Sequence, residues 1–345
     1  MVDQIRLTKW LAASLLAVFV FGLLGCDARP TEKVVSFNGM TMGTHFSMKW
    51  VAVDDAQLGE IRKDTGALLA EINRQMSTYI EDSELSLLNR SEPDQPLTVS
   101  AELMFVLQES RRISDWTEGA FDATVGPLVN LWGFGPTGRI ERAPSVEEIE
   151  QLRERIGYRY IELFPDSLQV QRNGEQYVDL SAIAKGYGVD ALAELLERKG
   201  IERYLVEIGG ELRASGTKPD GSAWTLAVEV PQAGTERSVQ TLISLERGAV
   251  ATSGDYRNYF EEDGVRYSHT IDPRTARPIE HRLASVTVIR PTCAEADALA
   301  TAFMVMGEEQ GYNFALKHNI EAFFISKGEQ GFTTRATPAF EAYIN

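Results

Sequence analysis

The chain has 345 residues, 43% of them hydrophobic, and a formal net charge of −16 at pH 7. This length can supply a sizeable core, in one large domain or two packed lobes. The acidic excess argues against nucleic acid as a partner, and a polyanionic ligand would need a cation or oriented backbone amides to offset repulsion.

The first segment has the pattern of a secretory signal. Arg6 and Lys9 precede an uncharged apolar run over residues 10–24. The run is shorter than the roughly 20 residues of a membrane-spanning helix. It ends in Leu23-Leu24-Gly25-Cys26, which resembles the bacterial lipobox. We therefore expect a signal peptide that is removed before Cys26; the alternative is an uncleaved signal-anchor helix.

Three regions follow from this interpretation: a signal peptide over residues 1–25, a lipidated Cys26 with a polar tether over 26–36, and one domain over 37–345. Asp27 resembles the retention signal of lipoproteins that stay in the inner membrane, so we expect a lipid-anchored protein on the periplasmic side. Lipidation uses one of the two cysteines and leaves Cys293 without a partner. No disulfide is expected.

Alternation over residues 45–50 predicts a strand, and apolar residues at helical spacing predict a helix over 58–76. Ser145 and Glu148 have the spacing of a capping box, as do Thr292 and Glu295 at the start of the last helix. The further segments predicted are helices over 100–116, 145–157 and 184–199, and strands over 160–164, 168–171, 204–208, 224–230 and 239–245. These uneven runs favour an α+β fold over a doubly wound parallel sheet.

Two oxygen-bearing side chains stand out on the last helix. Asp297 and Thr301 are four residues apart, so both emerge from one face within a turn of each other. That arrangement suits Mg²⁺, which takes few oxygen ligands from protein. On spacing alone, the favoured interpretation is an Asp that only complements the helix dipole.

Other motifs are less specific. Residues 178–188 join a strand to a helix and place Lys185 where free backbone N–H groups could bind phosphate, but the glycine spacing fits neither a Walker A loop nor a Rossmann fingerprint. The turns at 209–210 and 252–255 need be no more than turns. None of the four histidines has zinc-site spacing. Of these, His269 precedes a proline turn, where a side chain can face a cleft.

Taken together, eight short motifs resemble the ApbE family, whose members are FAD:protein FMN transferases. They are Thr41-Met42-Gly43-Thr44, Met76-Ser77-Thr78-Tyr79, Gly119-Ala120-Phe121-Asp122, Val125-Gly126-Pro127-Leu128, Val178-Asp179-Leu180-Ser181, Thr252-Ser253-Gly254, Ser268-His269-Thr270-Ile271-Asp272-Pro273 and Glu295-Ala296-Asp297. They occur in the family's order over nearly the whole chain beyond the signal. The resemblance implies mixed, largely antiparallel sheets packed with helices.

The resemblance also implies a site. Mg²⁺ would be held by Asp297, Thr301 and the main-chain carbonyl of Ala182. At residue 276 the family normally has Gly where this chain has Ala276, which costs about 1 kcal/mol if the turn needs a positive φ. The residues implied to line the FAD site are Met42, Tyr79, Ala120, Phe121, Asp122, Asp179, Lys185 and Ile271.

The expected reaction is phosphoryl transfer to a Ser or Thr of the acceptor, which leaves FMN as a phosphoester and releases AMP. His269 is the candidate general base and Asp297 its rival. By resemblance, acceptors are flavin subunits of ion-pumping quinone oxidoreductases and related electron-transfer complexes. Two alternatives remain: an FAD pyrophosphatase that yields FMN and AMP, and a non-enzymatic flavin-binding lipoprotein.

Overall fold

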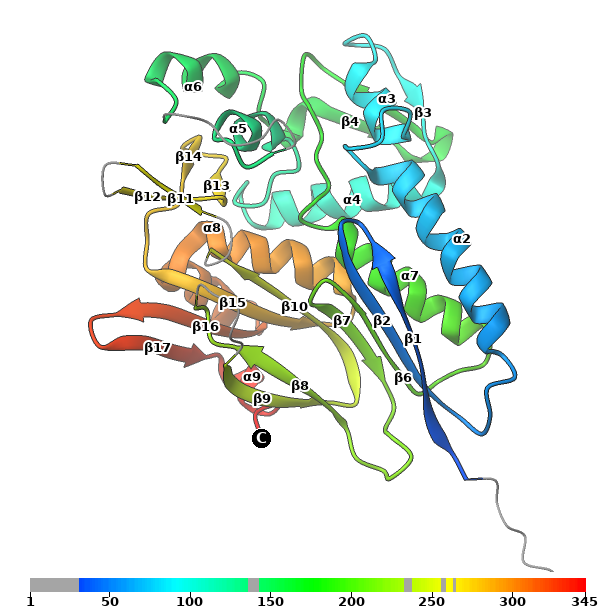
Figure 1. Ribbon diagram of the computed structural model, residues 1–345. Coiled ribbons are helices and arrows are strands. Elements are labelled where there is room, and N and C mark those ends of the chain that lie inside the picture. Colours follow the sequence, from blue (N-terminus) through cyan, green and yellow to red (C-terminus); the bar gives the residue numbers. More distant parts are fainter. Residues whose placement is uncertain (1–30, 136–142, 233–237, 256–258, 263–264) are drawn as a thin grey trace, which may run out of the picture.

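The centre of the molecule is an eight-stranded sheet of order β1-β2-β6-β7-β10-β15-β16-β17 (Figure 1). The computed structural model describes residues 31–135, 143–232, 238–255, 259–262 and 265–345. Every neighbouring pair in this sheet is antiparallel. Its strands are β1 (Lys33–Thr41), β2 (Thr44–Ala52), β6 (Tyr204–Ile208), β7 (Glu211–Ser215), β10 (Arg247–Gly254), β15 (Leu283–Arg290), β16 (Glu321–Gly328) and β17 (Gly331–Ala336).

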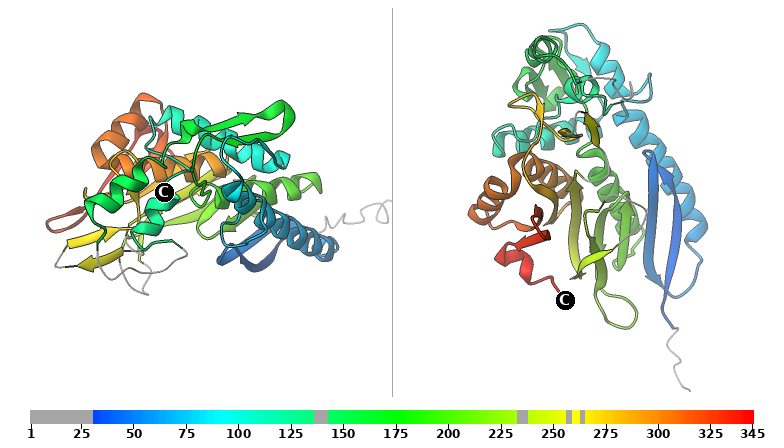
Figure 2. Two further views of the ribbon diagram at one scale, coloured as in Figure 1. Left: turned by 90° about the horizontal axis from the view of Figure 1, so that it is seen from above. Right: turned by 60° about the vertical axis from the view of Figure 1, so that its left-hand side comes forward.

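One face of the sheet is covered by helices. The helices are α2 (Leu58–Met76), α4 (Ala101–Trp116), α7 (Ala184–Arg198) and α8 (Cys293–Lys317). On this face α7 and α8 pack side by side. α7 lies on β6, and α8 lies on β10 and β15. The turned views in Figure 2 show the β1–β2 hairpin and α2 together on one flank. Because α8 is apolar on nearly all sides, most of the core forms around it.

The other face is covered over its centre by the hairpin of β8 (Trp224–Glu229) and β9 (Val239–Leu245) and by α9 (Pro338–Glu341). Trp224, Ile243, Phe323 and Phe340 meet there in a second apolar layer. Burial on both sides of an antiparallel sheet confirms the predicted α+β class.

Smaller elements lie above one end of the sheet (Figure 1). Three strands form one small sheet, and two further pairs form ribbons. These elements are α3 (Glu84–Arg90), β3 (Leu97–Thr98), α5 (Gly126–Leu131), α6 (Val146–Arg153), two 3₁₀ turns (Tyr158–Tyr160 and Pro165–Ser167), β4 (Ile161–Phe164), β5 (Gln169–Arg172), β11 (Tyr259–Glu262), β12 (Val265–Ser268), β13 (Ile271–Asp272) and β14 (Arg277–Pro278).

Several local predictions can be compared with these elements. The capping box at Ser145 and Glu148 is formed in both directions. The second one is wrong, because Thr292 makes no side-chain cap and Glu295 instead forms ion pairs with two arginines. Residues 33–36 of the predicted tether belong to β1, which begins at Lys33 and pairs with β2. The segment over 252–254 is not a turn but the end of β10.

Among the described residues, no helix is long and apolar enough to cross a membrane. The apolar run over 10–24 and Cys26 lie outside the described residues, so the structure has no bearing on the signal peptide.

Candidate active site

A cavity of about 720 Å³ lies where three segments meet: the tip of the β1–β2 hairpin, the end of α2 with the residues after it, and the start of α7. Met42, Tyr79 and Lys185, three of the residues predicted to contact FAD, lie together in its lining. The full lining is Met42, Gly43, Ile72, Asn73, Met76, Ser77, Thr78, Tyr79, Ile80, Ser181, Ala184 and Lys185.

One side of the cavity is formed by residues 77–80, called here the apolar wall. The chain leaves α2 at Ser77, whose N–H still donates to the carbonyl of Asn73 at 3.1 Å. Ser77 Oγ then accepts from the N–H of Tyr79 at 3.1 Å. After this turn the side chains of Tyr79 and Ile80 point outward. Tyr79 is 72% exposed and Ile80 is 37% exposed. The wall therefore offers flat apolar surface that a ligand could cover.

The hairpin tip forms a second side. Only Met42 and Gly43 separate β1 from β2, and their φ angles are 48° and 71°. Two positive φ angles are typical of a type I′ turn, which matches the twist of the flanking strands. Gly43 adopts this conformation freely, whereas Met42 is strained in it.

The third side is formed at the start of α7 by Ser181, Ala184 and Lys185. Glu211 and Asp297 lie behind Lys185 and do not line the cavity; these three charged residues are called here the acidic wall. Lys185 Nζ lies 2.5 Å from Glu211 Oε1. Asp297 Oδ2 accepts from the N–H of Gly186 at 3.1 Å. Glu211 and Asp297 are only 3% and 6% exposed. Glu211 was missed at the sequence level: it follows the Gly209-Gly210 turn, but nothing near it in the chain indicates that β7 lies beside α7.

The charges of this wall do not balance. Lys185 supplies one positive charge for two buried carboxyl groups. The pKa of Glu211 is raised to about 7: burial raises it most, the charge of Lys185 lowers it, and the charge of Asp297 raises it. Burial also raises the pKa of Asp297, and Lys185 offsets part of the effect. With both carboxyls ionised, one negative charge lacks a counter-charge, which favours a cation in this place.

The carbonyl of Ala182 adds to this fit. In a regular helix it would accept from the N–H of Gly186, but that N–H donates to Asp297 instead. No other described residue donates to this carbonyl. Thr301 is half-buried and follows Asp297 by one turn of α8. One carboxylate, one hydroxyl and one carbonyl are an oxygen set of the kind that Mg²⁺ accepts. The described residues contain no group of three or more His, Cys, Asp or Glu placed for a metal.

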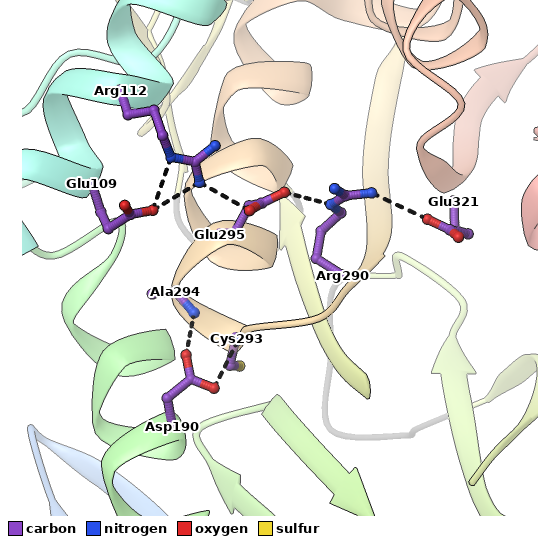
Figure 3. A network of polar contacts seen from close by, with 8 residues as sticks. All are labelled: Glu109, Arg112, Asp190, Arg290, Cys293, Ala294, Glu295 and Glu321. Atoms are coloured by element: carbon purple, nitrogen blue, oxygen red, sulfur yellow. Dashed lines mark hydrogen bonds and ion pairs between the residues drawn. The ribbon is translucent and has the colours of Figure 1, made fainter. Parts of the chain in front are cut away.

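The start of α8 is clamped against α7. Asp190 of α7 accepts from the N–H groups of Cys293 and Ala294, each at 2.9 Å (Figure 3). It also accepts from Arg213 Nη1 at 2.9 Å. It therefore takes the place of the cap that Thr292 does not make. Gly186 allows the close approach, because a Cβ there would lie 2.4 Å from the carbonyl oxygen of Cys293.

Other predicted FAD residues lie outside the lining. Ala120 and Phe121 are buried in the main core. Asp122 is 8% exposed and accepts from the N–H and hydroxyl of Thr124 and the N–H of Tyr158, at 2.8, 2.6 and 3.1 Å. Burial raises its pKa, and these hydrogen bonds offset part of the effect. The side chain of Asp122 thus holds two loops together.

Asp179 lies next to the cavity but faces its own turn. Its Oδ1 accepts from the N–H and hydroxyl of Ser181, at 2.9 and 2.5 Å. Its N–H donates to the carbonyl of Ala123 at 2.7 Å, which joins this segment to the one after Asp122. The predicted contact of Asp179 with FAD stays a prediction, as do those of residues 120–122.

The region around His269 forms a separate group. Its ring packs edge-on against Phe134, with centroids 6.3 Å apart. Ile271 is buried in an apolar cluster with Trp132 and Ala276. Ala276 has a φ of 58°, so the turn does need the left-handed conformation that its alanine disfavours. Neither His269 nor Ile271 belongs to the cavity lining.

Comparisons with known proteins agree with one another. A family model described as the ApbE family matches residues 42–324. The chain is 46% identical to an FAD:protein FMN transferase of Vibrio cholerae over 94% of this chain and 96% of the relative. It is 41% identical to one of Haemophilus influenzae, over 96% and 98%.

Solved structures give the same picture. The flavin transferase ApbE from Vibrio cholerae has a TM-score of 0.83 at 43% identity, with 90% of this chain and 99% of that chain covered. The apo form of the flavinyl transferase ApbE from Pseudomonas stutzeri has a TM-score of 0.83 at 40% identity, with 90% and 97% covered.

Proposed function

This chain belongs to the ApbE family and is an FAD:protein FMN transferase, and we propose that the cavity between its three walls is where FAD binds and reacts. The observation that carries this proposal is the contrast inside one cavity. Two buried carboxyl groups that share the single charge of Lys185 lie behind one side, and an exposed aromatic side chain lies on another. FAD has the matching parts, a diphosphate that binds with a cation and flat rings that stack.

Asp297, Thr301 and the carbonyl of Ala182 are the residues that we propose to hold Mg²⁺. When bound there, the ion would neutralise the diphosphate charge that an acidic protein otherwise repels. Lys185 Nζ adds a second positive group to the same side of the cavity, and Glu211 keeps it in place through their 2.5 Å contact. Lys185 and Glu211 are thereby added to Asp297 and Thr301, the pair that their spacing on one helix suggested.

Met42 and Tyr79 offer the surfaces that we propose for the flat rings of FAD. We propose that Asp122 supports the site indirectly. The hydrogen bonds that it accepts from Thr124 and Tyr158 hold the loop that carries Ala120 and Phe121. Through the bond from Asp179 N–H to Ala123, this loop is tied to the segment that ends in the cavity at Ser181. Ala120, Phe121, Asp179 and Ile271 would then contribute through backbone position as much as through side chains.

In the proposed reaction a Ser or Thr hydroxyl of the acceptor attacks the phosphorus on the riboflavin side of FAD. A new P–O bond forms, the P–O bond between the two phosphates breaks, and AMP leaves with the electron pair. The hydroxyl proton goes to a base. His269 and Asp297 are the two candidates. Asp297 is the nearer of the two to the cavity. Its carboxylate already accepts a hydrogen bond from the N–H of Gly186 and would also bind the proposed cation.

The test is to incubate the pure protein with FAD, Mg²⁺ and a flavoprotein subunit of an ion-pumping quinone oxidoreductase, the acceptor class that we propose. Covalent flavin on the acceptor, with one AMP per FMN, is expected. Free FMN and AMP without labelled acceptor would indicate an FAD pyrophosphatase, because water then takes the place of the hydroxyl. Unchanged FAD would indicate a flavin-binding lipoprotein without enzymatic activity.

The location is a separate proposal, based on the signal-like segment before Cys26. We propose that the protein is anchored by lipid at Cys26 to the periplasmic side of the inner membrane, close to its acceptors. Cys26→Ala should remove palmitate labelling and membrane retention but leave FMN transfer in solution within about twofold of wild type, because the lipid supplies location rather than chemistry. Palmitate incorporated into Cys26→Ala would contradict the anchor.

A further inference from the structure

The hairpin tip next to the cavity is held in a conformation that its sequence does not favour. Met42 adopts a left-handed φ of 48°, a region that residues other than Gly, Asn and Asp seldom occupy. Such a conformation persists only where the surrounding structure fixes it. The contacts of Thr41 and Met42 identify the groups that fix it.

A hydrogen bond ties the tip to α2. Asn73 Nδ2 donates to Thr41 Oγ1 at 3.1 Å, and Thr41 is only 9% exposed. The same Nδ2 donates to the carbonyl of Leu69 at 2.7 Å, so the helix itself orients the amide. The residue before Met42 is thereby fixed to the helix that leads into the apolar wall.

A glycine of α7 receives the side chain of Met42. A Cβ on Gly188 would lie 3.1 Å from Met42 Cε and 3.0 Å from Ile208 Cδ1. Glycine inside a helix is unfavourable compared with alanine. Its presence here is explained by the space that it leaves for the end of the methionine. Figure 1 shows the hairpin tip ending beside the first turns of α7.

We propose that Asn73 and Gly188 are positioning residues of the FAD site: Asn73 holds Thr41, Gly188 receives Met42, and together they set the flavin affinity by keeping Met42 in the cavity wall. The inference rests on the proposed function, because that function assigns Met42 to FAD. Neither contact belongs to the acidic wall, so their effect should appear in FAD binding and not in metal dependence.

Gly188→Ala is the decisive variant. The added methyl group requires Met42 Cε and Ile208 Cδ1 to shift by a few tenths of an ångström, and we expect the displaced methionine to raise the Kd for FAD roughly three- to tenfold. Because alanine is the better helix former, the melting temperature should not fall. A purely structural role would lower stability and affinity together. Gly66→Ala on α2 is the matched control, since a Cβ there meets nothing within 4 Å and should leave the Kd unchanged.

Thr41→Val tests the second contact and remains informative if Gly188→Ala does not fold. It removes the acceptor of Asn73 while keeping the shape, and Thr41 does not line the cavity. Loss of one hydrogen bond should raise the Kd roughly 2- to 10-fold.

Kd values are measured by quenching of flavin fluorescence without acceptor, in EDTA and again with Mg²⁺. If wild type binds FAD and both variants bind it within twofold of wild type, or more weakly only as stability is lost, the positioning role is overturned. If wild type binds no FAD under either condition, the proposed function itself fails.

Discussion

The acidic wall and the apolar wall lie at two sides of one cavity, which Lys185 and residues 77–80 line, but they are held in opposite ways. Glu211 and Asp297 are buried and are bonded to residues of another element. Tyr79 is 72% exposed, and its segment is shaped by a local bond of Ser77. A change in the acidic wall should therefore affect stability and chemistry together, whereas a change in the apolar wall should affect ligand affinity alone.

The largest effect is expected from Asp297→Ala. It removes the only charged side chain of the proposed Mg²⁺ set, so FMN transfer at ordinary Mg²⁺ concentrations should fall by more than about a hundredfold. The measurement is the transfer rate against Mg²⁺ concentration, beside the melting temperature.

Two related variants refine this test. Asp297→Asn keeps an oxygen and should recover part of the rate at high Mg²⁺, and Thr301→Ala should be milder. If Asp297 only complements the helix dipole, its loss lowers stability by about 0.3–1 kcal/mol with near-normal activity. Wild-type Mg²⁺ dependence in Asp297→Ala would remove the metal assignment.

Next in size is Asp190→Ala, which breaks the clamp below the acidic wall. Two N–H groups of α8 and the Arg213 guanidinium lose a buried partner, so the free energy of unfolding should fall by about 3–5 kcal/mol in urea titrations. Glu194→Ala on the same helix is the control. Its carboxylate is 56% exposed and pairs with Arg198 at 3.7 Å, so a change below about 0.5 kcal/mol is expected. Equal losses in both variants would contradict the clamp.

The acidic wall should also make stability depend on pH. Burial raises the pKa of Glu211 from 4.5 to about 7. Between these values the folded protein holds a proton that the unfolded chain has released, so stability falls as pH rises through this window and levels off above it. The loss over the whole window should be on the order of 3 kcal/mol.

Urea unfolding in EDTA at pH 5 and pH 8 measures this loss. Glu211→Gln cannot release the proton, so the fall in stability between the two pH values should be smaller than in wild type. An equal fall in both proteins would show that Glu211 titrates normally.

The smallest effect is expected from a change in the apolar wall. Tyr79→Ala should weaken FAD binding about tenfold, the equivalent of one lost stacking contact, and leave the melting temperature unchanged. Phe164→Ala on β4 is the control, because this ring is 40% exposed and does not line the cavity. A Tyr79→Ala protein that loses stability but keeps its FAD affinity would place Tyr79 in the fold rather than the site.

Local patterns predicted the elements that carry strong local signals. The helix over 184–199 and the capping box of Ser145 and Glu148 are confirmed. Strand β10 was missed because small residues such as Gly248, Ala249 and Ala251 fill it, so it lacks the alternation that identifies a strand exposed on one face.

The site shows the same limit. Asp297 and Thr301 lie one turn apart on α8, as their spacing predicts, and their role as a pair of metal ligands stays a prediction. The contact between Lys185 and Glu211 depends on β7 lying beside α7, which only the order of strands in the sheet determines. Asp122 was predicted from a motif to contact FAD. Nothing near it in the sequence indicates that its carboxylate accepts hydrogen bonds from Thr124 and Tyr158.

The pairing of β2 with β6 has a consequence for how the cavity comes into being during folding. Phe46 lies opposite Ile208, and Trp50 lies opposite Tyr204, so strands from distant parts of the chain must find each other. Such long-range pairing is slow. We expect the hairpin tip and the start of α7 to meet only once this pairing is made, so the dinucleotide should have no complete site before then. FAD should therefore slow unfolding without accelerating folding, since it can bind only after the rate-limiting barrier has been crossed.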